Sequence, residues 1–393
     1  METIRLFDQD AYATTFQSRV SSVTPVTGSE NCYEIILEQT LFFPEEGGQS
    51  PDLGTLGEGQ VQNVQIHDNI ITHTVCFHGP APAVSDTITG TIDWDHRFSN
   101  MQNHSGEHIF SGIVHRLFGF ENVGFHLSDN SVTMDYNGIL SPEDIRRVEH
   151  LANEAIYENI AIQCDYPDEA TLAALDYRSK KELSGPIRIV TIPGIDVCAC
   201  CAPHVHRTGE IGLLKVIASQ KYKGGIRLNI LCGHRAMAHY TASMELLQNL
   251  SHRLSAGVDQ LPEFIDRLTE DNRLLSGKLR DVSAAQLNKE IAGVDPDAKH
   301  VFLFTDAVDH LTLRNGVNAL VSMHSGFCGI FCASKDGFSY IVGSASLDSR
   351  EVGNVLRASF AAKGGGKPEM IQGSIQGVSS DALAAFLAEQ FPS

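Results

Sequence analysis

The chain has 393 residues, of which 42% are hydrophobic and 20% are charged, and its formal net charge at pH 7 is −19. A chain of this length can form two or three domains, each with its own hydrophobic core. The negative charge argues against non-specific binding of nucleic acid over the whole surface, so a polyanionic partner needs a local basic patch. No apolar run approaches the roughly 18 residues that cross a bilayer, and we expect no membrane partner.

The cysteines and the N-terminus bear on the cellular compartment. Nine cysteines, an odd number, and an acidic N-terminus without an apolar export signal predict reduced thiols and a cytoplasmic location. Six cysteines lie in mostly apolar contexts, and we expect ordinary buried thiols at Cys32, Cys76, Cys164, Cys232, Cys328 and Cys332.

Residues 1–90 are rich in β-branched residues with Gly and Pro between them. The stretches 31–43 and 59–75 predict strands, and the segment "PEEGGQSPDLG" separates them. We therefore expect a small β-barrel or meander as the first domain.

Residues 91–235 predict an α+β domain. Apolar residues at near-helical spacing predict a helix over 98–119, which places His104 and His108 one turn apart. A second helix is expected to begin after Ser141, a serine followed by proline. Strands are expected at 187–192, 211–220 and 225–231.

Residues 236–292 predict a helical linker or coiled-coil segment, divided near Pro262. An apolar stripe runs along residues 261–282, and Asn272 falls on it. The apolar members of the stripe are Leu261, Ile265, Leu268, Leu275, Leu279 and Val282. This pattern predicts either a homodimer through these helices or packing of the stripe on the protein's own domains.

Residues 293–393 predict an α/β domain. Strands are expected at 301–306 and 329–334, and a helix over 352–363. The glycine-rich stretch "GGGKPEMIQGSIQG" follows that helix, and another helix closes the chain.

Two short clusters contain residue types that bind metals. "HSGEH" holds His104 and His108, and "CCAPH" holds Cys200 and His204, with the same spacing of four. Three histidines and one cysteine supply the nitrogen and sulfur donors that zinc prefers, so the sequence predicts a zinc site. Two unrelated clusters are the alternative, and a different ligand subset would draw on Cys198, Cys201 or His206.

The order of these motifs resembles the editing half of alanyl-tRNA synthetase and the free-standing AlaX-type alanyl-tRNA editing proteins. "HSGEH" resembles the H-x-x-x-H of those families, and "CCAPHVHRTGEIG" resembles their C-x-x-x-H followed by V-x-x-T-G-E-I-G. "LFFPEEGGQSPDLG" resembles their F-Y-P-x-G-G-G-Q-P-x-D-x-G segment. "GGGKPEMIQGSIQG" resembles the glycine-rich signature of the DHH-associated domain of the longer AlaX proteins.

The chain departs from this pattern at named positions. Glu46 stands where the G-G-G-Q segment has its first glycine, Ser50 stands where it has proline, and "CCAPH" replaces C-G-G-T-H. The aminoacylation half of the synthetase has no counterpart in the sequence, and no Walker-type phosphate loop occurs. The resemblance therefore implies a protein that removes amino acids from tRNA without ATP and does not attach them.

The resemblance implies hydrolysis of alanine tRNA mischarged with serine or glycine, at a zinc ion held by His104, His108, Cys200 and His204. A site that hydrogen-bonds the serine hydroxyl favours serine over alanine, because alanine would leave a buried polar group unpaired. Zinc with an open position would activate water, whereas four protein ligands would close a tetrahedral site.

Further residues take candidate roles around this zinc. Thr40 and Gln49 are candidates for reading the hydroxyl, beside Gly47 and Gly48 of the substrate pocket. Structural roles in a strand and in a turn are the alternatives for Thr40 and Gln49 respectively. Glu107 and Gln49 are the candidate catalytic residues. A helical residue next to a ligand points about 100° away, so a structural role for Glu107 stays open.

Local basic residues predict the tRNA contacts. The candidates are Lys221, Lys223 and Arg227 in the editing domain, and Lys363 and Lys367 with Gly364, Gly365 and Gly366 between them in the terminal domain. Two other functions stay open: a non-catalytic tRNA-binding protein with structural zinc, and an inverted-zinc metalloprotease that uses the "HSGEH" residues.

Overall fold

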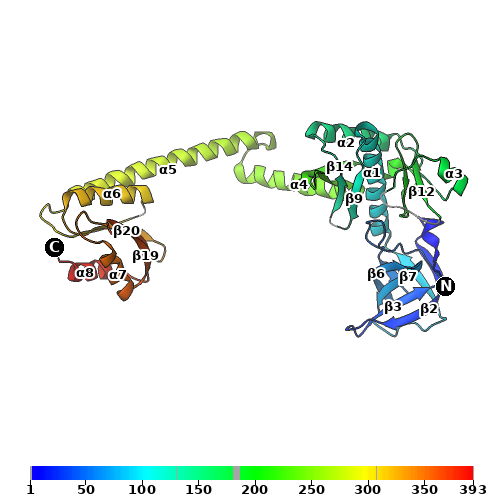
Figure 1. Cartoon of the computed structure of the whole chain (residues 1–393), viewed down its shortest axis with the longest axis horizontal. Coiled ribbons are helices and arrows are strands. Elements are labelled where there is room, and N and C mark those ends of the chain that lie inside the picture. Colours follow the sequence, from blue (N-terminus) through cyan, green and yellow to red (C-terminus); the bar gives the residue numbers. More distant parts are fainter. Residues whose placement is uncertain (1, 130, 180–185, 307, 393) are drawn as a thin grey trace. The chain divides into compact units, whose positions relative to one another are not determined.

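The computed structural model describes residues 2–129, 131–179, 186–306 and 308–392. The chain is a mixed α+β protein that divides into two compact units, Met1–Leu247 and Gln248–Ser393. The boundary lies inside helix α4 (Gly233–Leu254) (Figure 1). The finer division into four domains stays a prediction.

The first unit begins with strands that close into a ring, the barrel of this unit, in the order β2-β3-β7-β6-β5-β8. These strands are β2 (Thr15–Pro25), β3 (Cys32–Leu37), β5 (Gly54–Leu56), β6 (Gly59–His67), β7 (Ile70–Cys76) and β8 (Thr87–Ile92), with β1 (Ile4–Arg5) and β4 (Gln39–Thr40) paired beside them. Alternate side chains of each strand point inward, so burial alternates along β2 and β8. The core of the ring includes Phe42, Ile35 and Val64, all fully buried.

Two cysteines of this ring form a disulfide, which corrects the expectation of reduced thiols. Antiparallel pairing of β3 with β7 places Cys32 directly opposite Cys76, and the two are bonded. Their separation of 44 residues concealed the pairing, because register between distant strands is decided by the fold. Burial was also expected for Cys164, but this cysteine is exposed. Cys232, Cys328 and Cys332 are buried, as expected.

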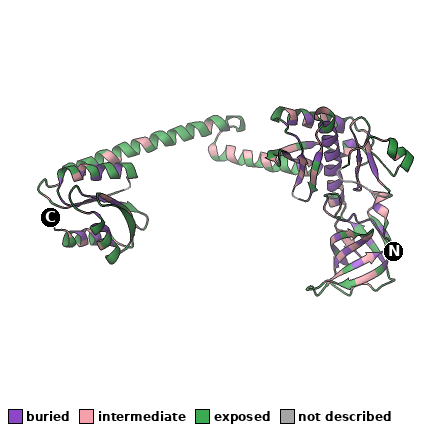
Figure 2. Ribbon diagram, viewed as in Figure 1, coloured by how far each residue is buried: buried purple, intermediate pink, exposed green. Residues whose placement is uncertain are grey.

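Helix α1 (Trp94–Phe118) follows the ring and carries the first histidine pair. Asp93 caps its start by accepting a hydrogen bond from the His96 amide, and Gly119 ends it in a left-handed conformation. The helix is buried from Asn100 to Val114 although many of its side chains are polar, as the continuous purple of α1 in Figure 2 shows. Buried polar side chains need partners, so this helix has to be surrounded by specific hydrogen-bonding groups.

The remaining elements of the first unit surround α1, which contacts α2, β9, β13 and β15. One sheet has the order β14-β15-β10-β9 and another the order β11-β12-β13. The strands are β9 (Asn122–Leu127), β10 (Val132–Tyr136), β11 (Gln163–Asp165), β12 (Ile189–Ile192), β13 (Asp196–Ala199), β14 (Leu214–Tyr222) and β15 (Gly225–Cys232). The helices are α2 (Pro142–Tyr157), which Ser141 caps as predicted, and α3 (Glu169–Ala174).

The second unit holds a sheet in the order β16-β17-β18-β20-β19. Its strands are β16 (Val301–Thr305), β17 (Cys328–Ser334), β18 (Gly337–Gly343), β19 (Ala361–Lys367) and β20 (Met370–Gln376). Its helices are α5 (Leu261–Ala292), α6 (His310–Met323), α7 (Arg350–Ser359) and α8 (Ser380–Gln390). Leu287 and Ile291 near the end of α5 pack into the core of this unit.

In the second unit one helix is shorter than predicted, and much of the apolar stripe is exposed. The helix predicted over 352–363 ends earlier, at Ser359, because the next residues pair with β20 as the edge strand β19. The predicted stripe lies on α5, and its members Ile265, Leu275 and Val282 are exposed. The partner for this stripe stays a prediction. Within the part of the chain that the structure describes, no helix is both long and apolar enough to cross a membrane.

Candidate metal centre

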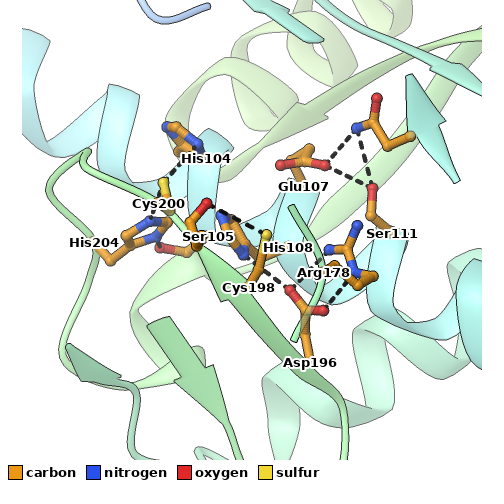
Figure 3. A network of polar contacts seen from close by, with 12 residues as sticks. His104, Ser105, Glu107, His108, Ser111, Arg178, Asp196, Cys198, Cys200 and His204 are labelled. Carbon is orange, nitrogen blue, oxygen red and sulfur yellow. Dashed lines mark hydrogen bonds and ion pairs between the residues drawn. The ribbon is translucent and has the colours of Figure 1, made fainter. Parts of the chain in front are cut away.

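Four side chains from two distant segments meet at one buried point in the first unit. His104 and His108 come from α1, and Cys200 and His204 come from the segment after β13. Their candidate donor atoms all lie within 4.8 Å of one another. The Sγ atom of Cys200 lies 3.5 Å from Nε2 of His104 and 3.4 Å from Nε2 of His204 (Figure 3). The two sequence clusters therefore come together in one group of possible donors, and His108 also belongs to a second such group with Asp196 and Cys198.

Each histidine is oriented by a hydrogen bond at its outer nitrogen, Nδ1. The partner of His104 is Oε1 of Gln49, at 2.7 Å. The partner of His204 is Oγ of Ser105, at 2.9 Å, which also accepts a hydrogen bond from the Val205 amide. With Nδ1 engaged in this way, Nε2 is left facing the centre, which is the arrangement found around metal-bound histidines.

The third histidine, His108, has a charged partner. Its Nδ1 lies 2.9 Å from Oδ2 of Asp196, the first residue of β13. Arg178 binds the same carboxylate through two hydrogen bonds of 2.7 and 2.9 Å. Figure 3 shows Asp196 between the imidazole and the guanidinium. Asp196 therefore holds His108 in a fixed orientation, and Arg178 compensates the negative charge of the buried carboxylate.

The protonation of these groups follows from burial and from their neighbours. Burial lowers the pKa of His204 to about 3, so its ring is neutral. Burial also acts to lower the pKa of His108, but the hydrogen bonds to Asp196 and Cys200 outweigh it and raise that pKa to about 9. Burial acts to raise the pKa of the Cys200 thiol, yet His104 and His204 hold it well below its usual range. Metal binding needs the thiolate and neutral imidazoles, so a metal bound here would displace the proton that His108 holds at neutral pH.

The donor set fits zinc in type and in spacing. Tetrahedral zinc has Zn–N and Zn–S bonds of about 2.0 and 2.3 Å, which set its donors about 3.5 Å apart. The two sulfur–nitrogen distances at Cys200, 3.5 and 3.4 Å, agree with that spacing. The residues present therefore fit the zinc ion that the sequence predicts.

A pocket of about 540 Å³ opens onto three of the four donors. It is lined by His104, His108, Cys198, Ala199, Cys200 and Cys201, by Arg5, Glu46, Gly47 and Gly48, by Val123, Gly124 and Phe125, and by Tyr166, Ser179, Pro186, Ile187 and Arg188. Arg188 donates hydrogen bonds to the backbone carbonyls of Cys200 and Ala202, so it also fixes the loop that carries two of the donors. The pocket is large enough for a small substrate group beside the metal.

One wall of the pocket comes from a tight turn, residues 46–49, of which Glu46, Gly47 and Gly48 line the pocket. Its central residues Gly47 and Gly48 have φ of +63° and +85°, a combination that type I′ turns require and that glycine adopts without strain. A Cβ atom on Gly48 would lie 2.3 Å from the carbonyl oxygen of Phe125. Backbone hydrogen bonds from Leu127 to Gly48 (2.7 Å) and from Ser50 to Leu127 (2.9 Å) fasten the turn to β9. The glycines thus allow this wall to approach the strand.

The two candidates for reading a hydroxyl lie in different places. Gln49 is fully buried, its Oε1 accepts from His104, and its Nε2 has no hydrogen-bond partner among the described residues. Thr40 does not line the pocket; its Oγ1 lies 2.9 Å from Nε2 of His73 inside the barrel and accepts from the Phe42 amide. The structure brings Gln49 into contact with His104 but leaves Thr40 in a separate network, and Gln49, like Thr40, does not line the pocket.

Glu107 is fully buried and does not line the pocket. Its Oε1 accepts hydrogen bonds of 2.6 Å from both Ser111 and Asn122. Figure 3 shows its carboxylate turned toward Ser111, on a different side of α1 from His104. This placement favours the structural alternative, and a role as proton acceptor stays a prediction.

The predicted tRNA contacts lie on exposed segments of the two units. Lys221 and Lys223 are exposed on the β14–β15 hairpin, whereas Arg227 is paired with Asp135 at 2.6 and 2.7 Å. Lys363, Gly364, Gly365, Gly366 and Lys367 form most of the exposed edge strand β19. Two positively charged residues, Lys221 and Lys223, therefore remain available on the hairpin, while the charge of Arg227 is compensated within the protein.

Sequence reasoning missed Asp196, Arg178, Ser105 and the pocket residue Arg188. Asp196 and Arg188 stand next to apolar strand segments. A charged residue beside a buried strand needs a partner, and this could have marked both as candidate site residues. Arg178 and Ser105 gave no signal, because their partners come from other segments of the chain.

Comparisons with known proteins match two parts of the first unit. The family described as "Threonyl and Alanyl tRNA synthetase second additional domain" matches residues 187–229, which include Cys200 and His204. The family described as "tRNA synthetases class II (A)" matches residues 6–96, which include the turn Glu46–Gln49.

Similar proteins include ligases and editing proteins. An "Alanine--tRNA ligase" of Pyrococcus abyssi is 28% identical over 96% of this chain and 42% of its own length. The "Alanyl-tRNA editing protein AlaX-L" of Pyrococcus horikoshii is 27% identical over 68% of this chain and 66% of its own length. The chain thus spans less than half of that ligase and just under two thirds of that editing protein. The solved C-Ala domain of Aquifex aeolicus alanyl-tRNA synthetase is 18% identical, covers 24% of this chain and 88% of that chain, and has a TM-score of 0.21.

Proposed function

We propose that this chain, a homologue of alanine–tRNA ligases and of alanyl-tRNA editing proteins, hydrolyses the ester bond of mischarged alanine tRNA. The proposed substrates are serine esters first and glycine esters second. The observation that carries the proposal is the convergence of His104, His108, Cys200 and His204 into one donor group, of which all but His204 line one pocket. Zinc, when bound there, supplies a Lewis acid and an activated water for ester hydrolysis.

The residues of the chain hold the donors and shape the pocket. Gln49, Ser105 and Asp196 each fix one imidazole ring, so the donor set is formed before any substrate enters. Val123, Phe125 and Ile187 give the pocket apolar walls that exclude water from the ester.

Selection of serine requires a polar group that alanine leaves unpaired. The Nε2 atom of Gln49 is buried, lies next to the donors and has no partner among the described residues. We assign it as the donor to the serine hydroxyl. Alanine in the same place would leave this amide unsatisfied, which disfavours alanine by about 1–3 kcal/mol.

Positive charge around the pocket suits the 3′ end of a tRNA. Arg5 and Arg188 line the pocket, although Arg188 also pairs with Asp8 at 3.9 Å, and the exposed Lys221 and Lys223 lie on the β14–β15 hairpin of the same unit. These residues supply local cations to a chain whose net charge is −19. The glycine-rich edge strand β19 and its two lysines are the proposed tRNA contact of the second unit. The homodimer through α5 and the cytoplasmic location stay predictions.

The test measures release of serine from Ser-tRNA(Ala), with Ala-tRNA(Ala) as the control substrate. Wild type is compared with the double variant H104A/C200A, and the zinc content of both proteins is recorded. We expect wild type to release serine selectively and the variant to lose both zinc and activity. The variant C164A, at an exposed cysteine outside the donor set, should keep both.

One observation favours a second candidate function. The donor set has four protein ligands, and four ligands close a tetrahedral zinc site as in structural zinc proteins. A tRNA-binding protein with structural zinc would bind Ser-tRNA(Ala) but leave its ester intact. Zinc-loaded wild type that binds without releasing serine would establish this alternative and overturn the deacylase proposal.

A further inference from the structure

The turn from Glu46 to Gln49 and the residue after it contain an unusual group of buried polar atoms. Oε2 of Glu46, Nε2 of Gln49 and Oγ of Ser50 are all buried without a hydrogen-bond partner among the described residues. Buried polar atoms are normally paired, so an unpaired one indicates a group that awaits a ligand. Of these three residues only Glu46 lines the pocket, and its carboxylate also contacts the Cys201 thiol, so Oε2 is the atom left for a ligand. Gln49 is already assigned in the proposed function, whereas Glu46 is not.

Glu46 has the chemistry to bind a cation. Among the described residues that line the pocket, it is the only carboxylate. The lining also contains two arginines, Arg5 and Arg188, and a bound zinc would add further positive charge. An aminoacyl ester brings an α-ammonium group into these surroundings, where only an anionic acceptor compensates it.

The carboxylate stands on a rigid support. The carbonyl of Glu46 accepts a hydrogen bond of 3.0 Å from the Gln49 amide, which closes the turn, and two backbone hydrogen bonds fasten the turn to β9. Gly47 lies against the donor loop, because a Cβ atom placed on it would be 3.6 Å from Sγ of Cys201. Glu46 is therefore held at the pocket wall before a substrate binds.

We propose that Glu46 is a specificity-determining residue whose carboxylate accepts hydrogen bonds from the α-ammonium group of the aminoacyl ester. This inference rests on the proposed function. Gln49 reads the side-chain hydroxyl and Glu46 reads the ammonium, so the turn binds two polar groups of one serine. The motif that this segment resembles has glycine at this position, so the carboxylate is a property of this chain.

The experiment removes the charge from each side of the contact in turn. The full chain, loaded with zinc, is assayed with Ser-tRNA(Ala) and with the glyceric acid ester of the same tRNA, in which a hydroxyl replaces the ammonium. Glu46→Gln keeps the size of the side chain and removes its charge. For the serine ester we expect kcat/KM of the variant to fall about 10- to 100-fold, the range of a charge-assisted hydrogen bond. For the glyceric ester we expect a change of less than about 2-fold.

The neighbouring acid provides a matched control. Glu45 is exposed, accepts a hydrogen bond of 2.6 Å from Gln65 and does not line this pocket. Glu45→Gln makes the same chemical change one residue away and should leave both esters unaffected. Zinc content and circular dichroism of both variants should match wild type.

The outcomes separate the inference from the proposed function. If Glu46→Gln slows both esters equally, the side chain only shapes the turn and the inference is wrong. If wild type hydrolyses both esters at the same rate, the inference is wrong while the deacylase proposal stands. If wild type hydrolyses neither ester, the proposed function fails, and the inference that rests on it fails too.

Discussion

The barrel and the candidate metal centre each bury histidine, and they use it in opposite ways. His73 in the barrel and His108 on α1 are both almost completely inaccessible. Both nitrogens of His73 have neutral protein partners, Thr40 and the carbonyl of Ile35. His108 has a charged partner, Asp196, at one nitrogen only, and its other nitrogen belongs to the donor cluster.

The comparison shows that burial alone does not mark a functional histidine. Burial lowers the pKa of His73 to about 4, and its contacts are complete within the barrel. The acidic partner of His108 overcomes burial and raises its pKa to about 9, leaving Nε2 beside the Cys200 thiol. An interior histidine whose contacts are complete serves stability, and one whose contacts are incomplete serves binding.

The largest expected effect is at the polar contact that joins the barrel to α1. Asp52 and Arg97 are both fully buried and form an ion pair, and Asp52 also accepts a hydrogen bond from the Phe43 amide. Asp52→Ala leaves a buried guanidinium without its carboxylate, so we expect the free energy of unfolding to fall by about 3–5 kcal/mol. Urea denaturation measures this loss.

A control for this prediction lies in the same barrel. Glu58 is exposed, so Glu58→Ala should change the free energy of unfolding by less than about 0.5 kcal/mol. Equal losses for Asp52→Ala and Glu58→Ala would show that the buried pair contributes no more than a surface residue.

The next effect is a pH dependence from His73. Its pKa is about 4 in the folded protein, against 6.5 for a histidine exposed to water, so the unfolded chain binds the proton more readily. The stability from a neutral His73 is therefore full above pH 6.5 and is lost as the pH falls from 6.5 to 4, by about 3 kcal/mol in total. We expect His73→Gln to remove this part of the pH dependence.

The measurement compares the slope of unfolding free energy against pH for wild type and His73→Gln. A chelator is present, so that metal release does not contribute to the slope. His78→Gln, at an exposed position of the same barrel, should keep the wild-type slope. An unchanged slope in His73→Gln would mean that the acid sensitivity arises elsewhere.

The smallest effect tests the charged partner of His108. Asp196→Asn keeps the shape of the side chain but weakens the hold on the imidazole, so we expect zinc affinity to fall about 10- to 100-fold. Competition with a chromophoric chelator measures this affinity. Asp165→Asn, at an exposed acid in the same sheet, should leave it unchanged, and equal affinities for all three proteins would contradict the assigned role of Asp196.

Several features of the site were readable from local spacing. His104 and His108 lie four apart on a helix, and the equal spacing of Cys200 and His204 pointed to a second pair. The consecutive glycines Gly47 and Gly48 indicated a turn, which the positive φ angles show. These features depend on residues within one turn of the chain, where sequence and geometry are closely linked.

Other features depended on how distant segments meet. The Cys32–Cys76 disulfide follows from the register of β3 and β7, and the expected helix over 352–363 is shortened by pairing with β20. The direction in which Glu107 points was settled by Ser111 and Asn122. Local periodicity carries no information about such partners.

The sequence by itself determined which atoms are available as metal donors and where the chain turns, because both depend on residue type and short spacing. The tertiary structure alone decided which nitrogen of each histidine faces the centre. That choice is made by Gln49, Ser105 and Asp196, whose side chains reach the imidazoles only after the turn, the helix and β13 have packed together. The same packing places Glu46 at the wall of the pocket, because backbone hydrogen bonds to β9 hold the turn that carries it.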